Sequence, residues 1–402
     1  MMQKIGSFLS LLVLLVSFEA YSESLKAGAW RFELKTAHAN VPFVIEFHWN
    51  KKRLEGTLFN GKESIPLKDI VYVRDSLFIP IQTYEITLEL KQDGANVLRG
   101  DLVRHNKNPK VRTGVIGKFG EKERFPGEKE KSTIDLNGKW MLTLTDDAGV
   151  ASRGVGVFEH KDNYFTGSIL TPTGDYRYCE GFVSGNEFQC ASFDGVYNYV
   201  LKGIVRDKRL DAGILSGSIT KVIGFADAKA ELPDAYKHTS LETQKFSFKF
   251  PDVKSHFVSL SDPQFHNKAV IVQIFGSWCP NCLDEMNYLI PWYKENKKRG
   301  IEIVALSFER SLDFNEARKQ LIRLKNKKEV PYPLLIAGAT SNDKPMDKLP
   351  GLKNFISFPT TIFLNKKHEV IKVHAGFSGP STGEFFEKWK TEFDENVNTI
   401  LK

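Results

Sequence analysis

The stretch Ala269-Val-Ile-Val-Gln-Ile-Phe-Gly-Ser-Trp-Cys-Pro-Asn-Cys282 decides the fold of the carboxy-terminal part of this 402-residue chain. Its apolar run up to Phe275 predicts a buried β-strand, and Gly276 marks the end of that strand. Apolar residues then recur at helical spacing, at Leu283, Met286, Ile290 and Tyr293. We therefore predict a strand, a Cys-x-x-Cys motif and a helix in immediate succession.

The position of this motif predicts how its two cysteines divide the chemistry. Cys279 falls at the helix N-terminus, where unpaired backbone N–H groups and the helix dipole favour an anion and increase the reactive thiolate fraction. Cys282 falls one turn later, within reach of the first sulfur. We expect Cys279 to attack a substrate disulfide and Cys282 to resolve the mixed disulfide. In the reverse reaction, the oxidised pair would transfer its disulfide to a substrate dithiol.

Two other interpretations of the motif are weaker. A lone Cys-x-x-Cys can form half of a zinc site, but zinc needs four ligands, and the sequence has no second such pair and no nearby pair of histidines. A purely structural disulfide is the other alternative, although so short a loop at a helix start is strained and easily reduced. We therefore favour redox chemistry on Cys279 and Cys282, and we predict no metal and no cofactor.

Strand and helix patterns alternate through the rest of this region, from about residue 240 to 402. Further strands are predicted at 245–250, 301–308, 333–336 and 360–364. One helix is predicted to start at a capping box of Asp313 and Glu316, and a final helix to start at Ser381 with Glu384 as its acidic partner. This order of elements is typical of an α/β domain.

Two motifs in this region, Trp278-Cys-Pro-Asn-Cys282 and Phe358-Pro-Thr-Thr361, resemble those of the thioredoxin superfamily. Within it, residues 240–402 resemble the exported TlpA/ResA-like thiol–disulfide oxidoreductases, and residues 311–336 match the insertion that separates these proteins from thioredoxin. The resemblance implies a thioredoxin-like fold and protein thiols or disulfides as substrates. It also implies a cis-proline at Pro359 beside the cysteines. The substrate contacts that it assigns are Trp278, Pro280, Asn281, Phe358 and Pro359.

The sequence departs from this family at the proton acceptor. Thioredoxin has a buried acid six residues before the first cysteine, whereas this chain has Gln273, whose amide cannot act as a general base. The proton of Cys282 must then go to water or to another group, and the candidates are Asp284, Glu285 and Glu309. The helix proline is displaced to Pro291. His374 could approach the site from the far side, but a satisfied surface histidine is the simpler interpretation.

The sequence pattern of the preceding half of the chain predicts a series of short β-strands. The turns between them recur at the spacing typical of an antiparallel barrel or sandwich. Representative strand segments are 43–49, 53–59 and 75–81. Landmarks recur in the same order, beginning with Gly28-Ala-Trp30 and Gly138-Lys-Trp140. We predict two related β modules, 23–130 and 131–236, joined at a charged segment, 121–131. Chance similarity among glycine-punctuated strands is the alternative.

The other two cysteines of the chain lie in the second predicted module. If the chain reverses at Ser184-Gly185, Cys179 and Cys190 face each other across a hairpin, and directly opposed cysteines can approach disulfide distance. An oxidising compartment would favour the bond. We predict a structural disulfide between Cys179 and Cys190, with two small buried thiols as the alternative. Neither interpretation makes this pair catalytic.

The first residues predict export. Lys4 precedes an apolar run from Phe8 to Phe18, and Glu19-Ala-Tyr-Ser22 supplies a small-x-small cleavage pattern, so we interpret residues 1–22 as a signal peptide. The run is too short to span a bilayer, which takes about 20 residues. We expect a mature chain that spans no membrane, in the periplasm or another extracytoplasmic compartment. The net charge of +7 includes no dense basic run among aromatics, which argues against nucleic-acid binding.

These features favour an exported disulfide reductase or isomerase that acts on protein thiols, with a membrane electron donor as a further partner. A thiol peroxidase is the second hypothesis, but that chemistry normally uses a threonine three residues before the reactive cysteine, where this chain has Gly276. A third hypothesis makes the chain an envelope binding protein whose β modules capture a partner, with an accessory redox domain. The sequence leaves the redox direction open.

Overall fold

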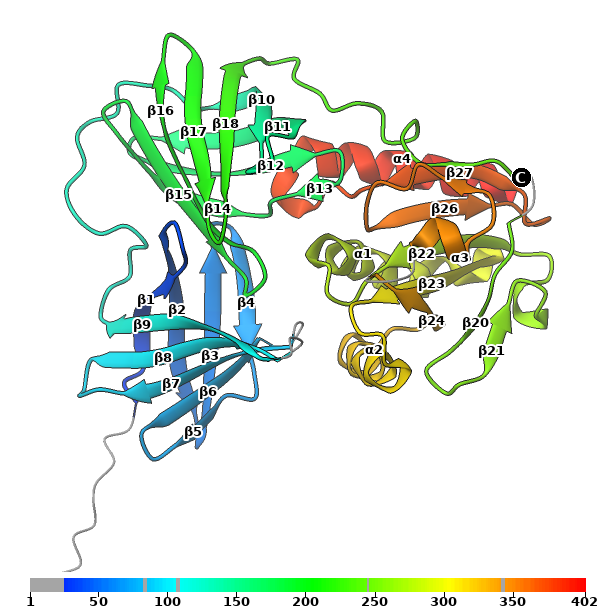
Figure 1. Cartoon of the computed structure of the whole chain (residues 1–402), viewed down its shortest axis with the longest axis horizontal. Helices are drawn as coiled ribbons and strands as arrows, with labels where there is room; N and C mark the ends of the chain where they lie inside the picture. The colour runs from blue at the N-terminus through cyan, green and yellow to red at the C-terminus, as the bar shows by residue number, and fades with distance from the viewer. Residues whose placement is uncertain (1–24, 82–84, 106–108, 244–245, 341–343) are drawn as a thin grey trace, which may run out of the picture.

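The computed structural model describes residues 25–81, 85–105, 109–243, 246–340 and 344–402. Within these ranges the chain forms two antiparallel β sheets followed by an α/β domain (Figure 1). The predicted signal peptide, residues 1–22, lies outside the described residues. In the part of the chain that is described, no helix is long and apolar enough to cross a membrane.

The first sheet has nine strands among the described residues. They are β1 (Gly28–Lys35), β2 (Asn40–Asn50), β3 (Arg53–Asn60), β4 (Glu63–Leu67), β5 (Val71–Val73), β6 (Ser76–Ile81), β7 (Ile86–Gln92), β8 (Val97–Arg104) and β9 (Val111–Phe119). Hydrogen bonds join them in the order β4-β3-β2-β1-β9-β8-β7-β6-β5. Every second residue of β3 is buried, so one face of this sheet lies on a core.

The second sheet also has nine described strands, and it closes on itself. They are β10 (Gly138–Thr145), β11 (Ala151–Lys161), β12 (Tyr164–Thr171), β13 (Gly174–Asp175), β14 (Cys179–Ser184), β15 (Glu187–Phe193), β16 (Asn198–Arg206), β17 (Arg209–Leu215) and β18 (Ile219–Ala226). Strand β12 pairs with both β11 and β14, which completes a ring of eight strands with β13 attached to β12. Buried rings such as Trp140, Phe165 and Phe188 fill its interior.

The two sheets share one strand order. Counted from its own first strand, each runs 4-3-2-1-9-8-7-6-5, and the second differs by the closing pair β12–β14. Trp30 and Trp140 occupy equivalent places in β1 and β10. Their indole N–H groups donate to the carbonyls of Lys26 and Leu136 at 2.9 and 3.0 Å. The shared order agrees with the predicted repeat, whereas the module boundaries stay a prediction.

The α/β domain is built on a sheet with the strand order β24-β23-β22-β26-β27. These strands are β22 (Ala269–Phe275), β23 (Ile301–Glu309), β24 (Leu334–Ala339), β26 (Thr360–Leu364) and β27 (Val370–Ala375). The helices are α1 (Pro280–Asn296), α2 (Phe314–Lys328), α3 (Pro345–Lys348) and α4 (Glu384–Leu401). The short strands β19 (Ser240–Leu241), β20 (Lys249–Pro251), β21 (Phe257–Ser259) and β25 (Leu352–Lys353) lie outside this sheet.

Strand β22 is the centre of this domain, and all of its residues are buried. Helices α1, α2 and α4 pack on one face of the sheet, where they form the larger core. Residues 246–265, Leu349 and β25 contribute to the core on the other face. Because both faces are covered, β22 has the continuous apolar sequence from which it was predicted.

The end of the chain differs from the prediction. Helix α4 begins at Glu384, and its N-cap is Gly383, which has no capping side chain. Ser381 lies one 3-10 turn earlier, and its hydroxyl donates to Ser168 at 3.0 Å and Asp175 at 3.1 Å of the second sheet. The predicted capping box at Ser381 was therefore wrong, because its hydroxyl is used in a tertiary contact.

Two other predicted element starts had mixed outcomes. Asp313 caps α2, because its side chain accepts hydrogen bonds from the backbone N–H groups of Asn315 and Glu316. The strand predicted at 245–250 is shorter in the structure, where only Lys249–Pro251 forms β20. Lys245, at its predicted start, lies outside the described residues.

Arg124 joins the two β sheets from the charged segment that connects them. Its side chain is 5% exposed, and all five of its N–H groups have acceptors. The acceptors are the Glu180 carboxylate at 2.8 Å, Asn60 Oδ1 at 2.8 Å, and the carbonyls of Ala191 at 3.0 Å, Pro42 at 3.3 Å and Phe59. These groups belong to both sheets, so this side chain fixes one sheet against the other.

We predict that Arg124→Ala destabilises the β region by about 3 kcal/mol, because it leaves Glu180 and the buried acceptors without a donor. Equilibrium unfolding in urea, followed by tryptophan fluorescence, measures the change. Arg153→Ala, at an exposed position of β11, is the control and should change the free energy of unfolding by less than about 0.5 kcal/mol. Equal losses in the two variants would contradict this role for Arg124.

Candidate active site

Cys279 and Cys282 lie where β22 passes into α1, as the sequence predicts. Cys279 is the N-cap of α1, and its sulfur accepts a hydrogen bond from the backbone N–H of Cys282 at 3.4 Å. The two sulfurs are not bonded to each other. Cys279 is 6% exposed and Cys282 is fully buried. The first turn of α1 therefore presents a backbone N–H group to the sulfur of Cys279.

The surroundings of Cys282 keep its thiol protonated. Burial, the sulfur of Cys279 and the negative charge of Glu285 all raise the pKa of Cys282 well above its ordinary value. For resolution of a mixed disulfide this proton must leave, since the thiolate is the nucleophile. The site therefore needs a proton acceptor close to Cys282.

Glu285 is buried one turn after Cys282 on the same helix. Burial raises the pKa of Glu285 to about 7, against two hydrogen bonds that lower it. Thr361 Oγ1 and Gln273 Nε2 each donate to one of its carboxylate oxygens at 2.7 Å. A buried carboxyl group that ionises near neutral pH is suited to accept a proton from a neighbouring thiol.

The other two candidate acids have other partners. Asp284 pairs with Arg177 at 2.7 Å. Glu309 accepts hydrogen bonds from the backbone N–H of Ser277 at 3.1 Å and from its hydroxyl at 2.6 Å. Glu309 thereby holds the loop just before the cysteine motif. Of the three candidates named from the sequence, Glu285 is the one that acts on the pKa of Cys282.

The second family motif lies against the first. The Phe358–Pro359 peptide bond is cis, as the resemblance implies. Cys279 donates its S–H to the carbonyl oxygen of Phe358 at 3.5 Å. Trp278 donates its indole N–H to Phe308 O at 2.9 Å, and its ring meets Phe358 edge-on with 5.5 Å between centroids. The structure thus brings together the predicted site residues of the two motifs around Cys279.

A cleft of about 490 Å³ opens at Cys279. Its lining residues are Thr173, Val196, Tyr197, Trp278, Cys279, Pro280, Asn281, Arg310, Ile356, Ser357 and Phe358. The first three belong to the second β sheet and its loops, and the others belong to the α/β domain. We refer to this space as the active-site cleft.

The residue between the two cysteines is held by the second β sheet. Asn281 is 4% exposed, and its Nδ2 donates to the carbonyl of Asp175 at 3.3 Å while its Oδ1 accepts from the Tyr197 hydroxyl at 3.2 Å. A Cβ atom on Gly174 would lie 2.2 Å from Asn281 Nδ2, so only glycine allows this approach. The sequence assigned Asn281 to substrate, whereas the structure engages both ends of its amide within the chain.

Arg177 is a further contact between the parts of the chain. Its side chain pairs with Asp284 of α1 at 2.7 Å, with Asp194 of the second sheet at 3.1 Å and with Glu63 of the first sheet. Arg177 is 8% exposed, so these charges meet away from water. Sequence reasoning missed Arg177, Tyr197 and Asp175, because nothing local in a β-strand pattern indicates contact with a helix about a hundred residues later.

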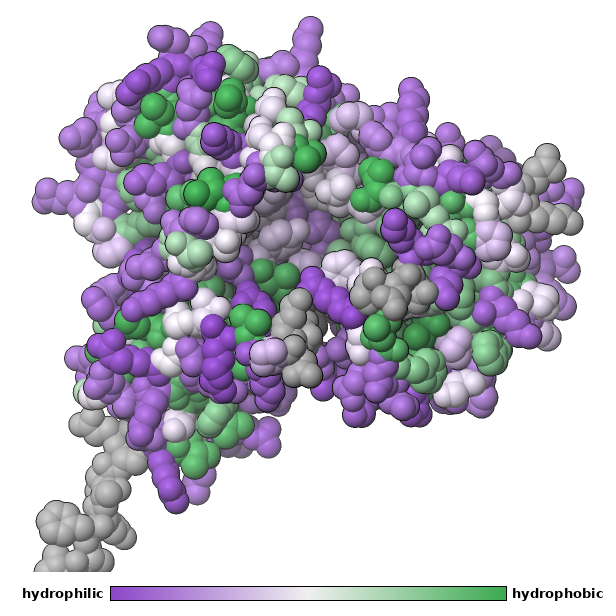
Figure 2. All heavy atoms as spheres, in the orientation of Figure 1, coloured by the Kyte–Doolittle hydropathy of each residue, from purple (hydrophilic) through white to green (hydrophobic). Residues whose placement is uncertain are grey.

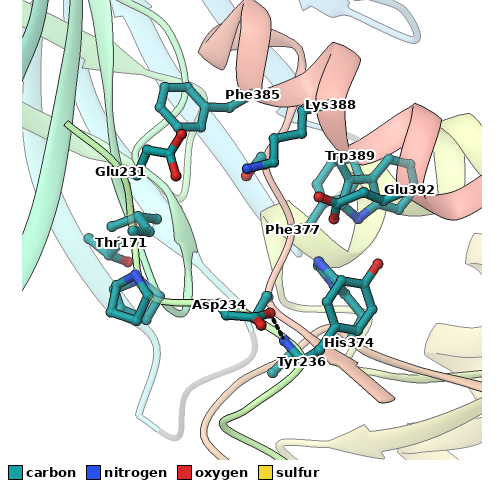
Figure 3. Close-up of a pocket in the computed structure, with 17 residues that line it drawn as sticks. Thr171, Glu231, Asp234, Tyr236, His374, Phe377, Phe385, Lys388, Trp389 and Glu392 are labelled. Atoms are coloured by element: carbon teal, nitrogen blue, oxygen red, sulfur yellow. Dashed lines mark hydrogen bonds between the residues drawn. The ribbon is translucent and has the colours of Figure 1, made fainter. Parts of the chain in front are cut away.

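His374 lies in a different cavity, of about 460 Å³, between residues 231–236, β27 and α4 (Figure 3). Its ring meets Tyr236 edge-on at 4.9 Å and lies near Trp389 at 6.4 Å. Burial lowers the pKa of His374 to about 4, so this ring is neutral at physiological pH. The interpretation as a surface histidine was wrong, and His374 does not line the active-site cleft.

The other cysteine pair is buried in the second sheet, away from the cleft. The register places Cys190 opposite Gly181, so Cys179 and Cys190 are diagonal neighbours and the expected direct opposition was wrong. Their sulfurs lie 2.9 Å apart. The close approach is possible because Gly181 has no side chain: a Cβ there would lie 2.5 Å from Cys190 Cα. A disulfide between the two remains a prediction.

Comparison with known families and proteins agrees with this geometry. Residues 231–385 match the family model described as Redoxin. The chain is 27% identical over 150 residues to the thiol-disulfide oxidoreductase ResA of Halalkalibacterium halodurans, a match that covers 37% of this chain and 77% of that protein. It is 28% identical over 129 residues to ResA of Geobacillus kaustophilus, which covers 32% of this chain and 66% of that protein.

Among solved structures, a thioredoxin-family thiol:disulfide interchange protein from Chlorobium tepidum TLS is 21% identical, with a TM-score of 0.30. That match covers 40% of this chain and 97% of the solved one. A thiol-disulfide oxidoreductase from Bacteroides fragilis is 19% identical, with a TM-score of 0.29, and the match covers 38% of this chain and 99% of that chain.

The raised pKa of Glu285 predicts a pH-dependent stability. The unfolded carboxyl loses its proton above about pH 4.5, whereas the folded one keeps it to about pH 7, so the free energy of unfolding should fall between these values. We expect this fall to be about 3 kcal/mol larger in the parent chain than in Glu285→Gln. Urea unfolding at pH 4.5 and pH 8 measures it.

The control for this experiment is Glu395→Gln, which changes an exposed carboxylate on α4. Its pH dependence should match that of the parent chain. If Glu285→Gln also followed the parent chain, the carboxyl of Glu285 would have to be ionised in the folded state well below pH 7.

Proposed function

We propose that the chain is an exported thiol–disulfide oxidoreductase acting on protein substrates as a reductase or isomerase, and the match of residues 231–385 to the Redoxin family model supports this proposal. One observation carries the proposal. A Cys-x-x-Cys dithiol stands at the N-terminus of α1, with Cys279 against the cis-proline loop and a buried acid behind Cys282. The ResA relatives support the same class of chemistry.

The reaction begins with the reduced Cys279–Cys282 pair. The thiolate of Cys279 attacks one sulfur of a substrate disulfide, which forms a mixed disulfide and releases the other substrate sulfur as a thiolate that takes up a proton. The thiolate of Cys282 then attacks the sulfur of Cys279. This step releases the second substrate sulfur and leaves the Cys279–Cys282 disulfide, so the substrate gains two electrons and the protein loses two.

The proton of Cys282 has an acceptor on its own helix. Glu285 is charged in part of the molecules near pH 7, because its pKa is about 7, and the buried thiol of Cys282 needs a base before it can attack. Gln273 donates to Glu285 at 2.7 Å and so orients the carboxylate instead of serving as the base. We propose Glu285 as the proton acceptor that the sequence left unidentified.

Export and the electron supply are part of the same proposal. The signal-peptide pattern at residues 1–22 supports an extracytoplasmic location, where a dithiol that reduces substrates must itself be reduced again. An electron donor in the membrane would meet this need. The reduction potential of the Cys279–Cys282 couple decides the direction, since a value near about −270 mV marks a reductant and one near about −120 mV an oxidant.

We predict that the reduced chain reduces the disulfides of insulin and that Cys279→Ser abolishes this activity, because the attacking sulfur is removed. Cys282→Ser should stop turnover but accumulate a mixed disulfide on Cys279, which mass spectrometry of the intact chain detects. Cys190→Ser, outside the cleft, is the control and should keep the activity.

Two results would contradict this function. Equal insulin reduction by Cys279→Ser and the parent chain would remove Cys279 from the reaction. Rapid consumption of hydrogen peroxide by the reduced chain, without insulin reduction, would instead favour the peroxidase hypothesis.

A further inference from the structure

Cys279 lines a cleft that has one wall outside the redox domain. Cys279 is 6% exposed, and the cleft that opens on it is lined by Thr173, Val196 and Tyr197 of the second β sheet as well as by the α/β domain. Figure 2 shows the molecule hollowed where these parts meet. A substrate sulfur that enters this cleft passes Thr173, Val196 and Tyr197, three residues in loops of the second sheet that we call the β wall.

This wall is fixed at the cysteine motif itself. Tyr197 donates to Asn281, and Asp175 accepts from the backbone N–H of Gly379 at 2.7 Å and from Ser381 at 3.1 Å. Both Asp175 and Asn281 are buried. Because the contacts involve buried polar groups, separating the wall from the redox domain would leave those groups without partners. The cleft is thus a built feature of the folded chain.

The size of the cleft limits what can enter it. Its volume of about 490 Å³ is in the range of sites that enclose a small molecule or a few residues of a peptide. Cys279 is largely covered, so a disulfide on a short, flexible chain can approach it with less obstruction than one held on the convex surface of a folded protein. The geometry selects a disulfide on a short, flexible chain.

The charge of the cleft comes from Arg310, which directly follows β23. Its guanidinium lies over the ring of Trp278, 4.6 Å from the centroid, and no carboxylate of the described residues pairs with it. The nearby acid Glu309 is buried and hydrogen bonded to Ser277. Arg104 is close enough that the charge of Arg310 helps to lower the pKa of Arg104. Arg310 therefore contributes a cation to the lining of the cleft, beside Trp278.

We propose that the second β sheet forms the substrate-binding wall of the active site, and that Arg310 binds a carboxylate next to the substrate disulfide. This inference rests on the proposed function and names its substrate class: a disulfide flanked by an acidic group on a short flexible chain. A peptide of low molecular mass and an unfolded protein segment share that chemistry. Thr173 and Tyr197 set the width of the cleft, and Arg310 sets its charge preference.

The charge preference is tested with short synthetic peptides that carry one cysteine as a methyl disulfide, flanked by Glu, Gln or Lys. Single-turnover rates with the reduced full chain should be about 10-fold to 100-fold higher for the Glu peptide than for the Lys peptide. Arg310→Gln should bring this ratio close to one, whereas Arg153→Gln, exposed on β11, should keep it. The ratio is used because Cys279 and Arg310 interact electrostatically, so a change at Arg310 can alter the rates of all peptides together.

The wall is tested by narrowing the cleft with Thr173→Trp, at an exposed position of its rim. This variant should slow all three peptides by about 10-fold or more, but alkylation of Cys279 by iodoacetamide, a much smaller reagent, should change by less than about 3-fold. Thr399→Trp, exposed on α4, is the matched control and should react like the parent chain.

The outcomes separate this inference from the proposed function. Reduction of all three peptides at equal rates, or no effect of Thr173→Trp, would overturn the inference and leave the oxidoreductase function intact. No reaction with any peptide or with insulin would overturn the function as well. Two further substrates are tested in the same way. One is glutathione disulfide. The other is an unfolded protein whose cysteines are reduced and blocked except for one, which carries a methyl disulfide flanked by acidic residues. If glutathione disulfide or the unfolded protein reacts faster than the Lys peptide, this result supports the inference. It also identifies which of the two kinds of disulfide substrate the cleft accepts.

Discussion

A buried guanidinium, that of Arg177, ties the three parts of the chain to one another. Asp284 on α1, Asp194 in the second sheet and Glu63 in the first all pair with it. Burial raises the pKa of Asp284 and of Asp194, and the charge of Arg177 opposes this effect, so both carboxyl groups depend on the arginine. Asp284 is also on the helix that carries the cysteines. The position of the β region relative to the active-site helix therefore follows from this cluster.

Burial gives the two groups behind Cys279 their chemical character. Burial raises the pKa values of both Cys282 and Glu285. The thiol of Cys282 therefore needs a base before it can react, and the carboxylate of Glu285 is basic enough to take up a proton near pH 7. Gln273 occupies the strand position where thioredoxin has its buried acid. Its amide donates to Glu285 at 2.7 Å, so the acid of this chain stands on the helix and the strand residue positions it.

The β region is part of the active site as well as a neighbour of it. Tyr197 and the carbonyl of Asp175 hold the amide of Asn281, which lies between the two cysteines. Most thiol–disulfide exchange needs an accessible sulfur, and here the access is a cleft with one β wall. Asn281, for which the family resemblance implies a substrate contact, thus also joins two parts of the protein.

Local pattern in the sequence determined the elements of the redox domain: the apolar run of β22, the start of α1 at Cys279 and the order of strands and helices all follow from neighbouring residues. The resemblance added the cis bond at Pro359. Only the tertiary structure placed Glu285 where its charge acts on the pKa of Cys282, buried His374 and brought Tyr197 to Asn281. Burial and contacts between distant segments set those outcomes, and neither is encoded in the residues adjacent along the chain.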